Sequence, residues 1–187
     1  LLLMAKLNTK GPFLLNTYQA YLKESFANFQ DHVERSKNSD FHLGAKIVRG
    51  AYLSYEINSS SGTVFDDISH THRSFDKIIE HAVYQQLAPS SVILASHNED
   101  SVAKAVLLKE ETDDKSVMFA QLHGMRDYIT FYLASRNFPV YKYVPYGTVH
   151  EAVPYLVRRA EENAGFFETL KYEKELISSQ LFKKLMG

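Results

Sequence analysis

The residues best suited to chemistry are two adjacent arginines, Arg158 and Arg159, in the segment 155–163. If this segment is helical, Tyr155, the arginines and Glu162 recur every three to four residues and share one face. A guanidinium is a planar fork that can grip a carboxylate through two hydrogen bonds, so the pair predicts a clamp for a carboxylate ligand. Spacing alone favours a simpler interpretation, a solvated helix face with Arg–Glu pairs.

The sequence before the arginines favours the clamp. β-Branched and aromatic residues alternate over 139–144, which is typical of a strand, and Pro145 and Gly147 end it. In α/β barrels and open α/β sheets, the carboxyl ends of strands and the starts of the following helices carry the chemistry. We therefore expect Tyr143 and the arginine pair to line one pocket.

The composition is that of one ordinary globular domain. The 187 residues are 45% hydrophobic and 23% charged, and a net charge of −1 with a pI near 6.8 gives no electrostatic argument for nucleic-acid binding. The absence of cysteine excludes disulfides and thiolate metal sites. The eight histidines lack the HxxxH and HExxH spacings of helix-borne ligands, so no metal site is expected. No apolar run reaches the roughly 18 residues of a transmembrane helix.

Segments typical of strands and of helices alternate along the chain. The expected strands are 12–18, 42–48, 91–95, 117–120 and 139–144. The expected helices are 20–36, 71–87, 101–109, 127–135, one around Arg158, and 166–185. Strands separated by helices predict a parallel α/β sheet, either a doubly wound open sheet or part of a (β/α)8 barrel.

Polar residues follow each expected strand and favour the barrel, whose catalytic face is built from strand ends. After the second strand, Gly50 and Ala51 would let the backbone approach a ligand closely. After the third, His97 is either a satisfied core imidazole or part of a Ser-His-Asn edge suited to a flavin or a phosphate. The strand-end residues are Gln19, Arg49 to Tyr52, His97 and Asn98, Gln121 and His123, and Tyr143. A complete barrel needs eight strands, and five are expected here.

Six ordered motifs resemble the proline dehydrogenase family, FAD-dependent (β/α)8 enzymes that oxidise L-proline to Δ1-pyrroline-5-carboxylate. They are NTYQAYLK (16–23), KIVRGAY (46–52), SHNED (96–100), QLHGM (121–125), YKYVPYG (141–147) and YLVRRAEEN (155–163). The fifth is similar to the eukaryotic mitochondrial branch. The resemblance implies that 1–187 is the C-terminal portion of one barrel domain, a TIM-like barrel of which strands four to eight are present.

The resemblance also implies a role for each substrate-side residue. Arg158 and Arg159 would hold the carboxylate of proline, while Tyr143 and Tyr155 pack around its ring. Lys46 would stabilise negative charge on the reduced flavin, at a position where bacterial members carry Arg. Further substrate contacts are implied for Ile47 and Tyr52. Flavin contacts are implied for Gln19, Lys46, the backbone of Arg49, Gly50 and Ala51, and for Thr71, Ser96, His97, Gln121 and Glu162.

Partners and alternatives follow from the same resemblance. It implies a quinone electron acceptor, peripheral association with the mitochondrial inner membrane on the matrix side, and no nucleic acid. A hydroxyproline dehydrogenase remains an alternative, although such enzymes tend to have a small residue where Tyr143 stands. Another flavin barrel such as a folate reductase, and an inactive fragment or interaction module, also remain. Because both sheet edges would be unpaired, we expect the 187 residues alone to fold poorly or to oligomerise.

Overall fold

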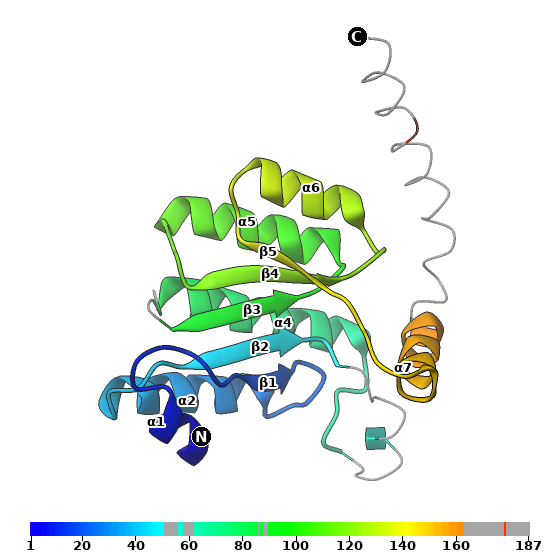
Figure 1. Cartoon of the computed structure of the whole chain (residues 1–187). Helices are drawn as coiled ribbons and strands as arrows, with labels where there is room; N and C mark the ends of the chain where they lie inside the picture. Colours follow the sequence, from blue (N-terminus) through cyan, green and yellow to red (C-terminus); the bar gives the residue numbers. More distant parts are fainter. Residues whose placement is uncertain (51–55, 58–61, 86, 88–89, 163–177, 179–187) are drawn as a thin grey trace.

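The computed structural model describes residues 1–50, 56–57, 62–85, 87, 90–162 and 178 (Figure 1). The described residues form one parallel sheet whose five strands are adjacent in chain order. The strands are β1 (Asn16–Gln19), β2 (Gly44–Val48), β3 (Ser91–Ala95), β4 (Val117–Leu122) and β5 (Val140–Tyr143). The prediction of an α/β fold with five parallel strands is confirmed.

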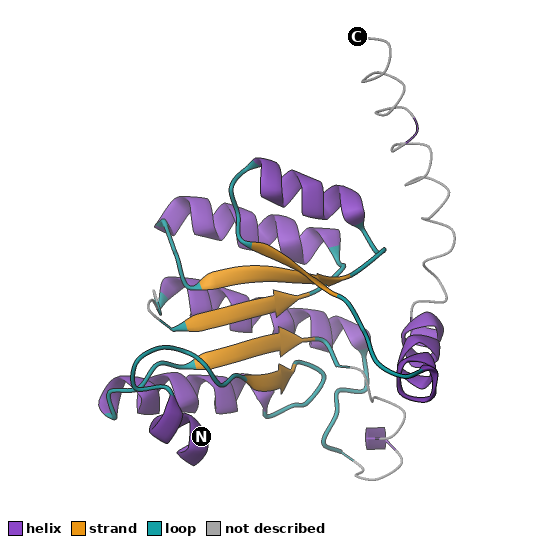
Figure 2. Cartoon of the chain, in the orientation of Figure 1, coloured by secondary structure: helices purple, strands orange, loops and turns teal. Residues whose placement is uncertain are grey.

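Helices alternate with these strands (Figure 2). They are α1 (Leu2–Leu7), α2 (Ser25–Asn38), α4 (Ile68–Tyr84), α5 (Glu99–Thr112), α6 (Asp127–Ser135) and α7 (Val149–Glu162). Helix α4 begins after Asp67, whose carboxylate accepts a hydrogen bond from the Ser69 N–H at 2.7 Å, and α5 begins after Asn98, which caps Ser101 at 2.9 Å. Such caps satisfy amide groups that have no partner inside the helix.

Alternation along the strands gives the sheet two different faces. One face packs against the helices and forms the core, in which fully buried Phe, Leu and Ile side chains each contribute about 1.5–3 kcal/mol. Its strand residues include Tyr18, Ala45, Ile47, Val92, Leu94, Val117 and Phe119, which cluster with Phe29, Val33, Phe75, Ile78, Ile79 and Leu133 of the helices. The opposite face, here called the open face, carries Thr17, Gln19, Lys46, Val48, Ile93, Met118, Tyr141 and Tyr143.

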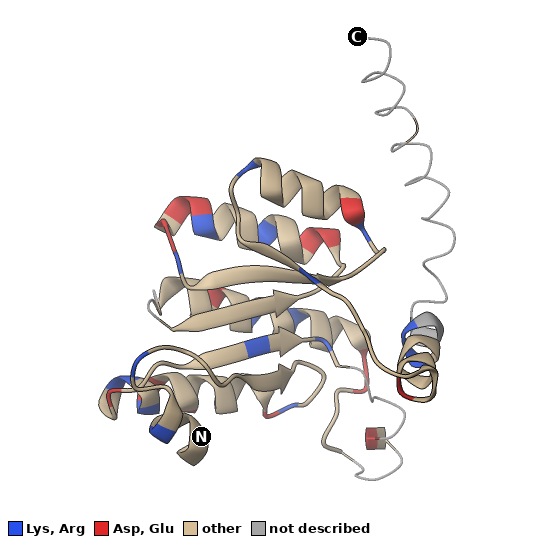
Figure 3. Ribbon diagram, in the orientation of Figure 1, with Lys and Arg blue, Asp and Glu red and all other residues tan. Residues whose placement is uncertain are grey.

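The strand order decides between the two sheet arrangements that the sequence left open. A doubly wound sheet reverses its strand order at a switch point and has helices on both faces. Here the order is sequential, and the strand residues of one face alone belong to the core cluster. This is the winding of a barrel segment. Figure 3 shows that charged residues lie mainly on helices and loops, with few on the strands.

Several element boundaries differ from expectation for identifiable reasons. The first strand begins at Asn16 rather than at residue 12, because Leu14 instead hydrogen-bonds the buried Asn8 side chain through both its N–H and its carbonyl group. Helix α2 begins five residues late, since the N–H groups of Ala20 and Tyr21 continue the sheet by donating to Val48 and Arg49 at 2.8 and 2.9 Å. Strand β3 and helix α6 match their expected ranges.

Candidate active site

The carboxyl ends of the parallel strands meet at one edge of the sheet, here called the carboxyl rim: residues 19–22, 48–50, 95–98, 122–125 and 143–147. Figure 1 shows all strand arrowheads pointing to this edge and α7 lying on that side of the sheet. The motifs recognised in the sequence therefore converge on one side of the molecule, although they span more than a hundred residues of chain.

At the ends of β2 and β3, Arg49 is the centre of a polar network. Its guanidinium donates to His72 Nδ1 at 2.9 Å, Ser96 Oγ at 2.7 Å and Ser101 Oγ at 2.8 Å. Its Cζ atom also lies 4.4 Å from the centre of the Phe75 ring. Burial lowers the pKa of Arg49, and the nearby carboxylates of Asp76 and Asp100 partly oppose this effect.

Gly50, which follows β2, adopts a conformation that requires glycine. Its φ angle is +128°, and a Cβ atom there would meet the Tyr21 ring at 1.6 Å. Tyr21 is buried, and its hydroxyl donates to Gln19 Oε1 at 3.0 Å, so the ring is held in place from the neighbouring strand end. The glycine is therefore explained by intramolecular packing and by its backbone geometry.

His97 at the end of β3 is held as a neutral imidazole. Its Nε2 atom accepts a hydrogen bond from the Leu122 N–H at 3.0 Å. Because a backbone N–H can only donate, Nε2 carries no proton, and the proton of the neutral ring is on Nδ1. Burial, together with the nearby positive charges of Lys142 and Arg126, lowers the pKa of His97 to about 4. Nε2 is therefore satisfied by the backbone of β4, and Nδ1–H is a hydrogen-bond donor.

Gln121 lies on the helix-covered side of β4, where it ties the strand to its neighbours. It is 3% exposed, and its Oε1 atom accepts from Thr130 Oγ1 on α6 and, at 3.5 Å, from Lys142 Nζ on β5. Lys142 in turn donates to the Met125 carbonyl at 2.8 Å and pairs with Asp127 at 2.7 Å. These contacts fix the loop that carries residues 121–125.

Helix α7 brings the arginine segment to the end of β5. The rings of Tyr143 and Tyr155 lie 5.6 Å apart at an interplanar angle of 57°. Arg159 places its Cζ atom 5.2 Å from the Tyr155 ring centre, within the range of a cation–π contact. Arg158, one position earlier, is exposed on the same helix. Tyr143, Tyr155 and Arg159 are thus grouped at the end of β5, and the expectation that Tyr143 and the arginine pair line one pocket stays a prediction.

The start of α7 is fixed by the Glu151 carboxylate, which accepts hydrogen bonds from the residue that precedes the helix, Thr148. Thr148 Oγ1 donates to the Glu151 carboxylate at 2.9 Å, and the Thr148 N–H donates to the same oxygen at 3.2 Å. Gly147 precedes it with φ of +144°, which allows the tight turn out of β5. This Thr-x-x-Glu pattern is a recognised start signal for a helix. It sets where on the carboxyl rim the arginines lie.

Lys46 and Ile47 separate onto opposite faces of β2. Lys46 lies on the open face and is exposed, in register with Thr17 on β1 and Ile93 on β3. Ile47 is 0% exposed and belongs to the helix-packed core. Because successive residues of a strand point to opposite faces, Lys46 and Ile47 lie on different faces of β2. The substrate contact expected for Ile47 stays a prediction.

The remaining expected residues fall in three groups. Gln19 is half-buried on the open face, and Thr71 is buried in the first turn of α4. Ala51 and Tyr52 lie outside the described residues. Glu162 is the last residue of α7, and its side chain is also outside the described part. Among the residues that the structure describes, no helix is long and apolar enough to span a bilayer, and no cluster of His, Asp or Glu could hold a metal ion.

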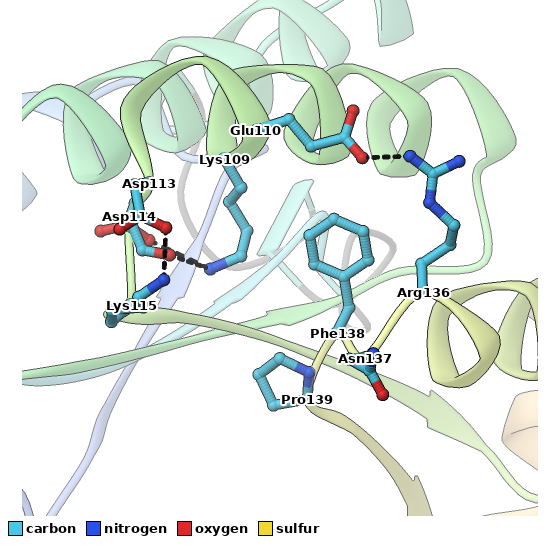
Figure 4. Close-up of a pocket in the computed structure, with 9 residues that line it drawn as sticks. All are labelled: Lys109, Glu110, Asp113, Asp114, Lys115, Arg136, Asn137, Phe138 and Pro139. Carbon is cyan, nitrogen blue, oxygen red and sulfur yellow. Dashed lines mark hydrogen bonds and ion pairs between the residues drawn. The ribbon is translucent and has the colours of Figure 1, made fainter.

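A cavity of about 410 Å³ lies at the opposite edge, near the amino ends of β4 and β5 (Figure 4). Its charged side chains pair with one another: Lys109 with Asp114 at 3.2 Å, Arg136 with Glu110 at 2.5 Å, and Lys115 with Asp113. In barrel folds this edge contributes to stability, whereas the carboxyl edge carries the chemistry. We therefore assign the candidate active site to the carboxyl rim.

Two features of the site were missed by sequence reasoning. The side chain of Arg49 bonds to residues that lie 23 to 52 positions away, so no local sequence pattern could predict this network. Lys142 bonds to residues 15 to 21 positions away, and its alternation with Tyr141 and Tyr143 on β5 indicates only that it lies on the other face.

Comparison with known proteins identifies the family. The family model described as proline dehydrogenase matches residues 1–171. The chain belongs to the proline dehydrogenase family. Among curated relatives, "Proline dehydrogenase 1, mitochondrial" of Homo sapiens is 39% identical over 193 residues, which are 96% of this chain and 32% of that protein. The Drosophila melanogaster protein of the same name is 36% identical and is covered over 30% of its length.

Proteins named hydroxyproline dehydrogenase match this chain at a similar sequence identity. The Mus musculus protein of that name is 35% identical over 95% of this chain and 41% of its own length. The chain thus spans about a third of the length of its curated proline dehydrogenase relatives.

Solved structures support the fold assignment. Proline utilization A of Bdellovibrio bacteriovorus superposes with a TM-score of 0.75 over 83% of this chain and 17% of that chain, at 23% identity, which shows the shared fold alone. Proline utilization A of Corynebacterium freiburgense matches 89% of this chain and 19% of its own, with a TM-score of 0.72 and 25% identity.

Proposed function

We propose that the protein is a flavin-dependent proline dehydrogenase that oxidises L-proline to Δ1-pyrroline-5-carboxylate, the first step of proline catabolism. Residues 1–187 form the C-terminal portion of its barrel domain, corresponding to the fourth to eighth strands. The family match over residues 1–171 and the sequential five-stranded sheet support this assignment. The related enzymes are about three times as long as this chain. We therefore assign the full reaction to the whole protein.

The observation that carries the proposal is the grouping of Tyr143, Tyr155 and Arg159 at the end of β5. Arg158 and Arg159 bind the substrate carboxylate, and each charge-assisted hydrogen bond contributes about 1.5–3 kcal/mol. The Tyr155 ring holds the Arg159 guanidinium in one orientation, which lowers the entropy lost on binding. The two tyrosine rings pack along the apolar ring of proline. These contacts hold the substrate by its carboxylate and its ring, and so orient its C5–H toward the cofactor site.

The carboxyl rim carries hydrogen-bond donors that match the acceptor atoms of FAD. Ser96 and His97 offer an O–H and an N–H at the end of β3, and a flavin ring is rich in acceptors. Gln19, Thr71, Gln121, Glu162 and the backbone of residues 49–51 complete the set that would hold the cofactor. When bound, FAD supplies the two-electron acceptor for the hydride that leaves C5 of proline as the amine proton is lost.

Lys46 is the fixed charge of the open face. It is exposed in the sheet and lies between Thr17 and Ile93 in register. We assign it to the stabilisation of negative charge beside the cofactor, which an ammonium group does without the planar fork of an arginine. We also propose a quinone as the final acceptor and a location at the matrix side of the mitochondrial inner membrane. The mitochondrial names of the related enzymes support that location.

The experiment is a reduction assay in the purified protein loaded with FAD. Under anaerobic conditions, L-proline should bleach the visible flavin band. Arg158→Met should raise the proline KM on the order of 100-fold, equivalent to about 3 kcal/mol of lost carboxylate binding, while flavin affinity stays unchanged. Equal loss of proline and flavin binding would reject the clamp, and a protein that binds no flavin would favour an inactive fragment or interaction module.

Hydroxyproline is the second candidate substrate, because relatives named hydroxyproline dehydrogenase match at 35–36% identity. Tyr143 distinguishes the two. Tyr143 is 52% exposed at the rim and its ring contacts Tyr155. We propose that it fills space that a substrate hydroxyl would require. Tyr143→Ser should lower kcat/KM for proline and shift preference toward hydroxyproline. A parent protein that already prefers hydroxyproline would overturn the choice of substrate.

A further inference from the structure

Arg49 joins separate elements at the carboxyl rim through one side chain. Three guanidinium nitrogens are engaged: Nε with His72 on α4, Nη1 with Ser96 after β3, and Nη2 with Ser101 in the first turn of α5. The Phe75 ring lies against the same group at 4.4 Å. A planar fork that meets three acceptors at 2.7–2.9 Å has little freedom to rotate. Arg49 therefore fixes the end of β2 relative to the end of β3.

Among the residues that the structure describes, the three side chains that accept hydrogen bonds from this guanidinium are all neutral. Asp76 is reached only through Ser101, whose Oγ donates to Asp76 Oδ1 at 2.8 Å, and Asp76 also pairs with Lys104 at 3.5 Å. A surface ion pair is therefore a poor description of Arg49. Its contacts instead determine which way two hydroxyl groups and one imidazole present their hydrogens.

The consequence is clearest at Ser96. Its Oγ atom accepts from Arg49 Nη1 at 2.7 Å and from the Asn98 N–H at 3.1 Å. A hydroxyl oxygen has two lone pairs, and both are now occupied. The Ser96 hydroxyl can therefore act toward any further partner only as a donor. Ser96 directly precedes His97, the other donor of this strand end.

His72 completes the arrangement on the far side of Arg49. Because Arg49 Nε can only donate, His72 Nδ1 must be unprotonated, which requires a neutral ring. Burial lowers the pKa of His72, and so does Arg49, while Asp76 and Asp67 oppose the shift. A protonated His72 would present N–H to N–H and repel the guanidinium.

We propose that Arg49 is a positioning residue that makes the Ser96 hydroxyl a hydrogen-bond donor to the flavin, with neutral His72 holding Arg49 in place. This inference rests on the proposed function, because the flavin is the acceptor in question. Arg49 itself acts through Ser96 and its side chain contacts neither substrate nor reacting atoms. This role is separate from the backbone contacts implied for residues 49–51.

A double-mutant cycle on flavin affinity tests the inference, measured by fluorescence titration of the apoprotein with FAD. Ser96→Ala and Arg49→Met should each weaken binding about fivefold, the value of one neutral hydrogen bond, and the double variant should be no weaker than Arg49→Met alone. A purely structural role for Arg49 would give additive losses instead. Lys104→Met, which removes contacts to Asp76 and Glu80 without touching Arg49, is the matched control and should bind FAD normally.

The pH profile of flavin affinity gives a second readout, which stands even if Arg49→Met fails to fold. Because the pKa of His72 is lowered in the folded protein, the parent protein should keep its affinity near the ordinary histidine pKa of about 6.5 and lose it as the pH falls further. His72→Gln retains a neutral acceptor and should bind FAD with an affinity that does not change over that range. An unchanged profile in His72→Gln would overturn the role of His72. Failure of the parent to reduce flavin with proline would instead reject the proposed function and leave these affinity tests intact.

Discussion

Replacing Arg159 distinguishes two interpretations of the arginine segment: a clamp for a carboxylate, and a solvated helix face. Arg159→Met removes two charge-assisted hydrogen bonds to substrate, which together contribute about 3 kcal/mol or more, so kcat/KM for proline should fall on the order of 100-fold. The contact with the Tyr155 ring, at 5.2 Å, adds about 0.5–1 kcal/mol of orientation before substrate arrives. Tyr155→Phe retains the ring and should stay within about threefold of the parent, whereas Tyr155→Leu should lose roughly fivefold.

Arg159→Lys keeps the charge but loses the fork, and it should fall between these limits at roughly tenfold. The assay is anaerobic flavin reduction at several proline concentrations, with FAD affinity measured separately by titration. Arg136 provides a matched control: its Cζ atom lies 6.0 Å from the Tyr132 ring centre, it pairs with Glu110, and it lies away from the carboxyl rim. Arg136→Met should leave proline kinetics unchanged. A KM for Arg159→Met equal to that of the parent would refute the clamp.

Three further predictions concern the scaffold. Since the pKa of His97 is about 4 in the folded chain and about 6.5 when unfolded, its contribution to stability is complete above pH 6.5 and is lost as the pH falls toward 4; His97→Gln should flatten this part of a urea-unfolding profile. Asp114→Ala should cost about 3–5 kcal/mol because it strands the buried Lys109, and Lys109→Met should cost less because Asp114 keeps its bonds to Ser116 and Val117; thermal melts reversing that order would contradict this. Gly50→Ala should lower the free energy of unfolding by about 2 kcal/mol or more, and a melting temperature equal to that of the parent would show that the Tyr21 ring can move aside.

Local patterns predicted the elements with strong local signals. Strand β3 is a short apolar run with a polar residue on either side, and α6 is bounded by Asp127 and Ser135, so both ranges agree with the structure. The position of polar residues after each strand predicted the winding of the sheet, because such residues collect at one rim only when the strands are parallel. The same reasoning placed Tyr143 near the arginine segment, and in the structure its ring lies 5.6 Å from that of Tyr155 on α7.

Long-range contacts account for the differences. Residues 20 and 21 have helix-compatible side chains, yet their N–H groups bond to residues at the end of β2 and just after it, nearly thirty positions away, and α2 begins later for this reason. Asn8 captures the backbone of Leu14 and so shortens β1. The position of Ile47 needed no long-range information, since alternation with Lys46 already places it in the core.

A crystal structure of the flavin-loaded protein with a cyclic carboxylate that cannot be oxidised would test the central claim most directly. The account predicts that the guanidinium groups of Arg158 and Arg159 both lie about 2.7–2.9 Å from the carboxylate oxygens, with the rings of Tyr143 and Tyr155 against the ligand. A ligand bound elsewhere, with both arginine side chains directed into solvent, would contradict it.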